Sequence, residues 1–220
     1  MISFKHTLCT TPLPELIKYE LEDLTRLRIT GRGAELIVQP GDSVGGDKVR
    51  AELKIKDTGG ENETWWYAYS FFIPNTFVAG NGHAIIGQLH DGKPASGTWP
   101  GRPPLLALRY YAQGYDFVYG TKEKRHVSAS TPLQKATWVR IMWRVFWSQT
   151  TAGSADVFVN GKPSVSFKSP NLYGPEKSYF KFGIYEPDGI VKTTSVILKE
   201  VAVGPTREYV ETVTKEEQSK

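Results

Sequence analysis

The feature that most constrains the fold of this chain is a succession of about a dozen short segments in which apolar and polar residues alternate. Such alternation is typical of β-strands, whose successive side chains point to opposite faces. Two examples are residues 49–55, V-R-A-E-L-K-I, and residues 178–187, S-Y-F-K-F-G-I-Y-E-P. Between two further segments, Asn160-Gly161 predicts a two-residue hairpin turn. The pattern predicts an all-β fold, a two-sheet β-jelly-roll sandwich of the concanavalin-like kind, with a concave sheet that forms a groove.

Length and composition fit one such sandwich. The chain has 220 residues, 40% of them hydrophobic, which is enough for a single domain over residues 1–220. Its net charge of +4 is compatible with a polyanionic partner. Cys9 is the single cysteine, so an intrachain disulfide is excluded. Two stretches are less decided: residues 1–25 fit a short helix or an irregular edge strand, and residues 121–136 indicate a polar loop.

Three of the predicted strands carry a row of polar side chains on one face. These rows are Arg50, Glu52 and Lys54; Gln88 and His90; and Tyr179, Lys181 and Tyr185. A sandwich buries one face of each sheet in its core, so the other face of a sheet is available to form a groove. If the three rows lie side by side there, a guanidinium, an amide, an imidazole, an ammonium group and a phenol come together.

This set of groups suits β-elimination from a uronic-acid polymer. The proton on the carbon next to the sugar carboxylate is very weakly acidic, so its removal requires that the carboxylate charge be neutralised. Arginine and glutamine donors can neutralise it. A histidine or tyrosine takes the proton, and a tyrosine gives one to the departing glycosidic oxygen. The chemistry requires no metal or organic cofactor, and a structural calcium ion is left open.

The same residues resemble the motifs of a known group of enzymes. R-A-E-L-K, Q-L-H and Y-F-K-F-G-I-Y are similar to R-[ST]-E-L-R, Q-[IV]-H and Y-F-K-A-G-x-Y-N-Q, the signatures of an alginate lyase family. They also resemble the broader heparin-lyase-like and glucuronan lyases of the same jelly-roll fold. The likeness in order and spacing extends from Arg50 to Tyr185. It implies a polysaccharide lyase that cleaves alginate, glucuronan or a similar polymer and leaves 4,5-unsaturated ends.

The resemblance also implies a role for each matching residue. Arg50 and Gln88 would neutralise the carboxylate, and His90 would be a base or a partner of that carboxylate. Tyr185 would be the acid, or both acid and base, while Glu52 would orient Arg50. The residues expected to contact substrate are Glu52, Lys54, Trp99, Arg109, Tyr179 and Lys181.

Two features bear on the choice of substrate. The chain departs from the alginate-lyase pattern at four places, namely Ala51 for serine or threonine, Lys54 for the second arginine, Phe182 for alanine, and Glu186-Pro187 for asparagine-glutamine. These departures favour the broader group and make glucuronan as plausible as alginate. Residues 91–104 form a long glycine- and proline-rich loop directly after His90, which we expect to border the groove and to contribute to substrate selection.

Two other functions remain open on the same fold. A glycoside hydrolase needs two carboxylates flanking the scissile bond, and the E-x-D-x-x-E signature of jelly-roll glucanases does not occur. A non-catalytic carbohydrate-binding module or lectin would account for the aromatic residues. It would not account for the polar rows that contain Gln88, His90 and Lys181.

The expected partner is an anionic polysaccharide, bound by a monomer, with neither nucleic acid nor membrane involved. No apolar run approaches transmembrane length. The first nine residues lack the apolar run of a signal peptide. Either the chain is not exported by that route or its signal peptide is absent from this sequence. We expect the second, with a secreted or periplasmic location.

Overall fold

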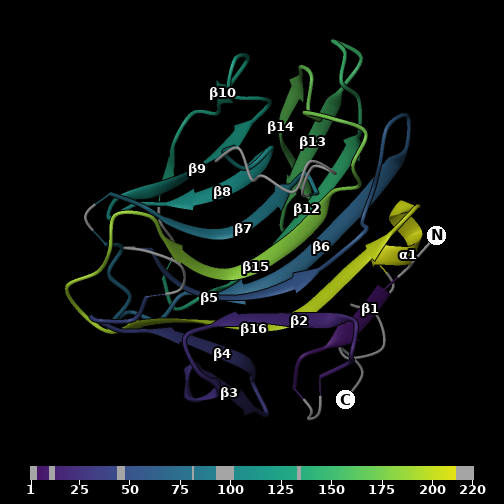
Figure 1. Ribbon diagram of the computed structural model, residues 1–220. Coiled ribbons are helices and arrows are strands. Elements are labelled where there is room, and N and C mark those ends of the chain that lie inside the picture. Colours follow the sequence, from purple (N-terminus) through teal and green to yellow (C-terminus); the bar gives the residue numbers. More distant parts are fainter. Residues whose placement is uncertain are drawn as a thin grey trace.

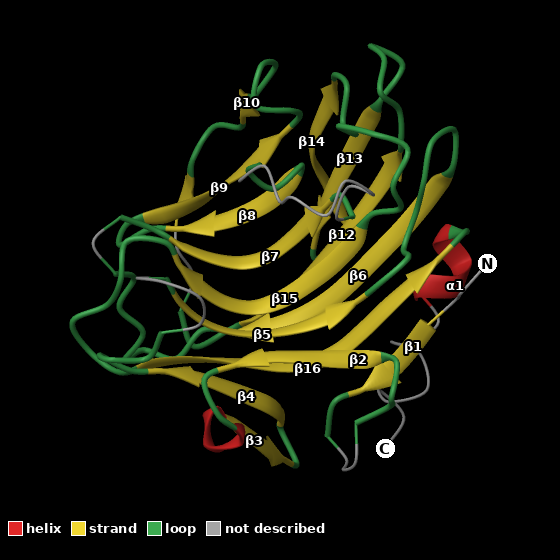
Figure 2. Ribbon diagram, in the orientation of Figure 1, coloured by secondary structure: helices red, strands yellow, loops and turns green. Residues whose placement is uncertain are grey.

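Two curved antiparallel β-sheets pack face to face and account for nearly all of the ordered structure (Figures 1 and 2). The computed structural model describes residues 4–9, 13–43, 48–80, 82–92, 102–132 and 135–211. Besides strands, these ranges contain a 3-10 helix, η1 (Leu24–Arg26), and a short α-helix, α1 (Arg207–Glu211). The chain passes repeatedly from one sheet to the other. The predicted all-β jelly-roll sandwich is therefore confirmed.

The first sheet runs in the order β14-β13-β12-β6-β16-β4-β3, and β1 pairs with β16. Its strands are β1 (Phe4–Thr7), β3 (Leu27–Thr30), β4 (Gly33–Val38), β6 (Thr64–Phe72), β12 (Trp138–Phe146), β13 (Ser154–Val159), β14 (Lys162–Lys168) and β16 (Thr194–Gly204). Asn160 and Gly161 connect β13 to β14 with φ angles of 51° and 77°. Both angles are positive, as a type I′ turn requires, so the predicted hairpin is confirmed.

The second sheet runs in the order β10-β9-β8-β7-β15-β5-β2, and β11 pairs with β9. Its strands are β2 (Ile17–Leu21), β5 (Val49–Ile55), β7 (Ala84–His90), β8 (Leu106–Tyr110), β9 (Gly114–Tyr119), β10 (His126–Val127), β11 (Thr131–Pro132) and β15 (Tyr179–Glu186). For residues 1–25 a short helix or an irregular edge strand was expected, and the structure has the edge strand β2 there. The two-residue strands β10 and β11 interrupt the stretch predicted as a loop.

Aromatic side chains from both sheets fill the core between them. Tyr69 of β6 and Trp143 of β12 come from the first sheet, and Phe180 of β15 comes from the second. All three are fully buried, and their ring centroids lie 5.5 to 5.8 Å apart. Truncating such a side chain typically costs about 3–5 kcal/mol. Because Phe180 points into this core, its neighbours Tyr179 and Lys181 point to the outer face of the second sheet.

A bulge in β15 lies at Gly183. Its φ angle is 147°, and the pairing of β15 with β7 shifts register between Phe182 and Tyr185. A Cβ atom at Gly183 would lie 2.3 Å from the carbonyl oxygen of Ala51 on β5. The space that the glycine leaves is thus occupied by the neighbouring strand and not by a ligand.

Candidate active site

The outer face of the second sheet holds a cavity of about 790 Å³ that spans β5, β15, β7, β8 and β9. Five residues predicted to share one face line it together: Arg50, Gln88, His90, Lys181 and Tyr185. A second cavity of about 610 Å³ extends toward β2 and shares Arg50, Tyr179 and Lys181 with the first. The two cavities form one groove across the sheet, which we call the cleft.

Strand pairing sets the polar rows against one another. Tyr185 is paired with Arg50 across β15 and β5, and Lys181 is paired with Gln88 across β15 and β7. Side chains at facing positions have Cβ atoms roughly 4.5–5.5 Å apart. The guanidinium carbon of Arg50 lies 4.7 Å from the centre of the Tyr185 ring. The rows predicted from alternation are thus adjacent.

The larger cavity is strongly basic. Seven of its lining residues are lysine or arginine, namely Lys48, Arg50, Arg102, Arg109, Lys122, Arg125 and Lys181. None of the described lining residues is Asp or Glu. A recess lined by one sign of charge raises the local concentration of ligands of the opposite sign. This part of the cleft suits a polyanion.

A buried carboxylate, Glu52 of β5, lies beneath this basic surface. Its Oε1 accepts a hydrogen bond from Nε2 of Gln88 at 2.5 Å. Its Oε2 lies 4.0 Å from Nη1 of Arg50 and 3.8 Å from Nζ of Lys181. Burial raises the pKa of Glu52, while the charges of Lys181 and Arg50 act in the opposite direction. With 1% of its surface exposed, Glu52 is placed to orient Gln88 and Arg50 and offers little for a sugar to touch.

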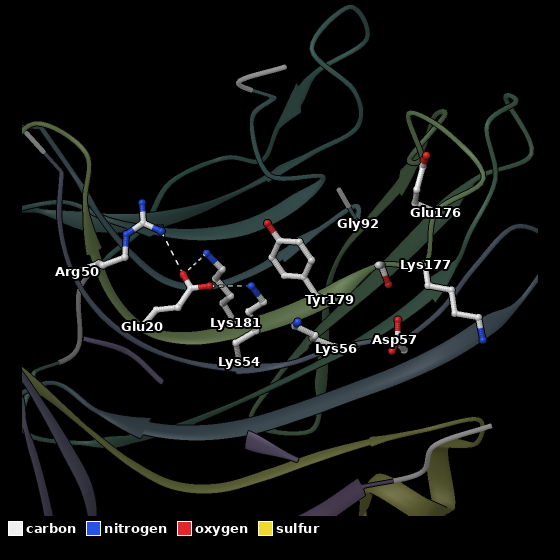
Figure 3. Close-up of a pocket in the computed structure, with 11 residues that line it drawn as sticks. Glu20, Arg50, Lys54, Lys56, Asp57, Gly92, Glu176, Lys177, Tyr179 and Lys181 are labelled. Atoms are coloured by element: carbon white, nitrogen blue, oxygen red, sulfur yellow. Dashed lines mark hydrogen bonds and ion pairs between the residues drawn. The ribbon is translucent and has the colours of Figure 1, made fainter. Parts of the chain in front are cut away.

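A second carboxylate, Glu20 of β2, forms ion pairs with three cations in the smaller cavity (Figure 3). Its Oε1 accepts from Nζ of Lys54 at 2.8 Å. Its Oε2 accepts from Nζ of Lys181 at 2.5 Å and from Nη1 of Arg50 at 3.2 Å. Burial acts to raise the pKa of Glu20, but Lys181 and Lys54 prevail and lower it to about 2. Glu20 therefore stays ionised and holds these cations in place.

Tyr179 and His90 stack at the centre of the cleft. Their ring centroids lie 5.3 Å apart and their planes differ by 3°. The ammonium groups of Lys54 and Lys181 lie 4.6 and 5.4 Å from the centre of the Tyr179 ring. Burial raises the pKa of Tyr179 far above its ordinary value, and nearby carboxylates add to the effect. The Tyr179 phenol therefore keeps its proton.

Both ring nitrogens of His90 face oxygen atoms. Nδ1 lies 2.9 Å from Oδ1 of Asp91, and Nε2 lies 2.9 Å from the backbone oxygen of Arg102. The other oxygen of Asp91 accepts from Nη1 of Arg102 at 2.7 Å. A neutral imidazole can donate to only one such acceptor, whereas the protonated ring can donate to both. The arrangement suits a ring that donates hydrogen bonds.

Arg109, predicted to bind substrate, lies on β8 at the far side of the cleft. It is held by two hydrogen bonds of 2.8 Å to the carboxylate of Asp116 on β9. The hydroxyl of Tyr111 donates to the same carboxylate at 3.2 Å. His83, a loop residue whose pKa burial lowers, also lines this side. Arg109 is thus in the cleft but already paired.

The loop predicted to border the cleft is described only at its ends. Residues 93–101, with Trp99, lie outside the described residues. At the near end, Gly92 lines the smaller cavity. At the far end, Arg102 and the two prolines after it line the larger one. Both described ends of the loop therefore reach the cleft.

Glu20 and Arg125 are among the cleft residues that the sequence analysis did not identify. Glu20 lies in the stretch left undecided between helix and strand, although I-K-Y-E-L alternates over residues 17–21. That alternation was the available signal. Arg125 lies in the stretch predicted as a loop, and no pattern in the sequence marks it.

Over the described ranges, no group of three or more His, Cys, Asp or Glu side chains is placed to hold a metal ion. Within the same ranges, no helix is long and apolar enough to span a membrane.

Comparison with known proteins gives a consistent picture. A family model described as "Polysaccharide lyase" matches residues 10–202. No curated protein matches the chain. Among solved structures, the endo-β-1,4-glucuronan lyase from the fungus Trichoderma reesei has a TM-score of 0.70 and 15% identity, covering 94% of this chain and 97% of that one.

Two alginate lyases of polysaccharide lyase family 7 are also similar. A1-II' has a TM-score of 0.63 and 17% identity, covering 86% of this chain and 93% of that one. AlyA1 from Zobellia galactanivorans has a TM-score of 0.58 and 17% identity, covering 84% of this chain and 82% of that one. At these identities the likeness concerns the fold.

Proposed function

The chain belongs to the polysaccharide lyase family, and we propose that it cleaves a uronic-acid-containing polysaccharide by β-elimination. The observation that carries this proposal is the convergence of Arg50, Gln88, His90, Lys181 and Tyr185 on one basic cavity. In the reaction, the proton leaves the carbon that bears the sugar carboxylate. The electron pair of that carbon–hydrogen bond forms a carbon–carbon double bond, the bond to the glycosidic oxygen breaks, and that oxygen receives a proton.

Arg50 and Gln88 are the donors that would hold the reacting carboxylate. Negative charge grows on that carboxylate as the proton leaves, and donors already in place stabilise it without reorganisation. Glu20 fixes the guanidinium of Arg50, and Glu52 fixes the amide of Gln88. The amide of Gln88 has a second N–H, which remains available for the substrate.

Tyr185 is the residue we assign to proton transfer, as both base and acid. Of the two tyrosines in the cleft, Tyr179 keeps its proton because burial raises its pKa, which argues against a role as base. His90 has both nitrogens against oxygen atoms of the protein, so neither presents a free lone pair to the substrate. We therefore give His90 the second of the two roles expected for it, that of a partner of the carboxylate, for which one ring nitrogen would exchange its contact with Asp91 or Arg102 for the substrate.

The polymer is alginate, glucuronan or another polyuronate. Two of the four departures from the alginate-lyase pattern, Ala51 and Phe182, are fully buried in the core and do not meet the substrate. The departures that reach the cleft are Lys54 and Pro187. Lys54 is paired with Glu20, so its replacement of arginine changes a contact within the protein. The departures from the pattern therefore bear less on the choice of polymer than the sequence suggested.

A glycoside hydrolase is the weaker alternative. Hydrolysis needs two carboxylates roughly 5–9.5 Å apart on either side of the bond. The described lining of the larger cavity, where the proposed catalytic residues lie, has no carboxylate. The smaller cavity is lined by Glu20, Asp57 and Glu176; Glu20 is held by three cations, and Asp57 and Glu176 lie at the other end of that cavity (Figure 3). A lectin would not need a phenol, an imidazole and an amide arranged around one basic recess.

Tyr185→Phe tests the proposal. The substitution removes one oxygen and keeps the ring, so the fold should be unchanged. Wild-type protein should produce ultraviolet-absorbing unsaturated ends from polymannuronate, polyguluronate or glucuronan, and none from a neutral glucan. The variant should be slower by at least the roughly 10²–10⁴-fold that is typical of lost acid–base catalysis.

Tyr19→Phe is the matched control, because Tyr19 is 44% exposed on β2 and does not line either cavity. It should keep the wild-type rate. His90→Asn should lose less activity than Tyr185→Phe, and the reverse order would give the role of base to His90. A folded Tyr185→Phe protein with a near-normal rate would refute the catalytic assignment.

A further inference from the structure

Five of the ten lysine and arginine residues that line the cleft are paired with a carboxylate of the protein itself. The pairs are Arg50, Lys54 and Lys181 with Glu20, Arg102 with Asp91, and Arg109 with Asp116, at 2.5 to 3.2 Å. A cation compensated in this way has less to gain from a carboxylate of the substrate. The cations that do not have such a partner therefore matter most for binding a polyanion.

Arg125 is partly buried in the wall of the larger cavity and has no such carboxylate. Its Nη1 donates to the backbone oxygens of Pro104 at 2.6 Å and Gly120 at 3.3 Å. Among the described residues no ion pair joins Arg125 to Asp or Glu. Burial lowers the pKa of Arg125; Tyr173 opposes this effect, and the positive charge of Arg109 adds to it. A partly buried charge without a counter-charge destabilises the free protein, and a bound anion would reduce that destabilisation.

The position of Arg125 separates it from the reaction centre. It lies between β9 and β10, at the side of the cleft opposite Glu20 and β2. The two backbone oxygens hold one nitrogen of the guanidinium and so fix its direction. The planar fork of a guanidinium matches the two oxygens of a carboxylate. A polyuronate carries a carboxylate on each sugar, so a chain lying across the sheet brings one to this side.

We propose that Arg125 binds a second carboxylate of the polymer, beyond the sugar that reacts, and is a specificity-determining residue for anionic chains. The proposal rests on the proposed function for the class of the polymer. This contact is made equally before and during the reaction. Its loss should therefore raise KM and leave kcat unchanged.

Arg125→Gln is the first variant, because it removes the charge and keeps a polar, hydrogen-bonding side chain, which is shorter than that of arginine. Lys124→Gln makes the same change of charge at the adjacent residue, which is exposed and does not line the cavity. Arg125→Lys keeps the charge and replaces the planar guanidinium by an ammonium group. Each variant is assayed on the polyuronate that wild-type protein cleaves, and its thermal unfolding is measured without ligand.

Arg125→Gln should raise KM about tenfold, the effect of losing one charged hydrogen-bonded contact. Its kcat should stay within about twofold, and it should unfold no earlier than wild type because the uncompensated charge is gone. Arg125→Lys should fall between the two, and Lys124→Gln should match wild type. High salt should shrink the difference between Arg125→Gln and wild type.

A binding measurement tests this inference independently of the reaction. Titration calorimetry of glucuronan and alginate oligosaccharides is run in the Tyr185→Phe background with and without Arg125→Gln. About tenfold weaker binding on loss of Arg125 supports the proposal even if no unsaturated product ever forms. Equal KM and binding in Arg125→Gln and Lys124→Gln would overturn it. So would a loss in kcat alone, or impaired folding of Arg125→Gln while Arg125→Lys keeps wild-type KM, because Arg125 would then only support the loop ends.

Discussion

Glu186, the last residue of β15, carries a prediction about how stability depends on pH. Its side chain is 1% exposed and lies on the core side of the strand, next in sequence to Tyr185. One carboxyl oxygen accepts a hydrogen bond from the backbone N–H of Gly80 at 3.0 Å. The other has no hydrogen-bond partner within the described part of the chain. Burial raises the pKa of Glu186 to about 7, with Asp188 adding to the rise and Gly80 opposing it.

A carboxyl group whose pKa is raised by folding destabilises the folded state once it is ionised. A rise of the pKa from 4.5 to about 7 corresponds to about 3 kcal/mol of the free energy of unfolding, and this amount is lost in full above about pH 8. Below about pH 4.5 both the folded and the unfolded state hold the proton, so the destabilisation vanishes. Between about pH 5.5 and about pH 8.5 this group alone should lower the free energy of unfolding by about 2 kcal/mol.

Glu186→Gln removes the ionisation and keeps an oxygen that accepts from Gly80. Urea unfolding followed by tryptophan fluorescence measures the free energy of unfolding at both pH values. The variant should gain about 2 kcal/mol relative to wild type between about pH 5.5 and about pH 8.5. Glu123→Gln, the same change at an exposed residue, should follow the wild-type profile. Parallel pH profiles for wild type and Glu186→Gln would refute the reasoning.

Two further variants test the groups that hold the cleft together. Glu20→Gln should lower the free energy of unfolding by about 2–3 kcal/mol near neutral pH, since Glu20 has a pKa of about 2. That difference, read from urea titrations, should shrink as the pH falls from about 4.5 toward 2, and a constant difference would contradict it. Gly183→Ala should cost about 2–4 kcal/mol, because its Cβ would strike Ala51. Gly189→Ala, also at positive φ but in open space, should cost about 1 kcal/mol, and equal losses would count against the clash.

The charge pattern of the cleft has a consequence for the bound polymer. Near β2, Glu20 and Glu52 compensate Arg50, Lys54 and Lys181, so the protein supplies its own carboxylates to these three cations. Near β9 and β10, Arg125 is uncompensated among the described residues. A polyanion should therefore be attracted most strongly at that side, because it does not have to displace a protein carboxylate from Arg125 when it binds there. This asymmetry gives the two ends of the cleft different affinities for carboxylates.

Much of the candidate site could be predicted from the sequence because a strand has a side-chain period of two. Once the apolar row of Val49–Ile55 is assigned to the core, Arg50 and Lys54 must face outward. The same logic holds for Lys181 and Tyr185 on β15. The two-residue turn at Asn160-Gly161 was equally local, because its backbone angles favour those residue types. These predictions needed only the backbone geometry and the order of residues.

Tertiary structure decided everything that depends on which strands are neighbours. Glu20 reaches Arg50 and Lys181 only because β2 pairs with β5, and β5 with β15. His90 acquires its second oxygen contact because the chain returns at Arg102 after a loop. Such pairings rest on hydrogen bonds and packing between segments far apart in sequence, and alternation within a segment carries no information about its neighbour. The sequence by itself therefore determined which face of β5, β7 and β15 carries the polar rows, and only the fold decided which other residues join them in the cleft and which charges are compensated.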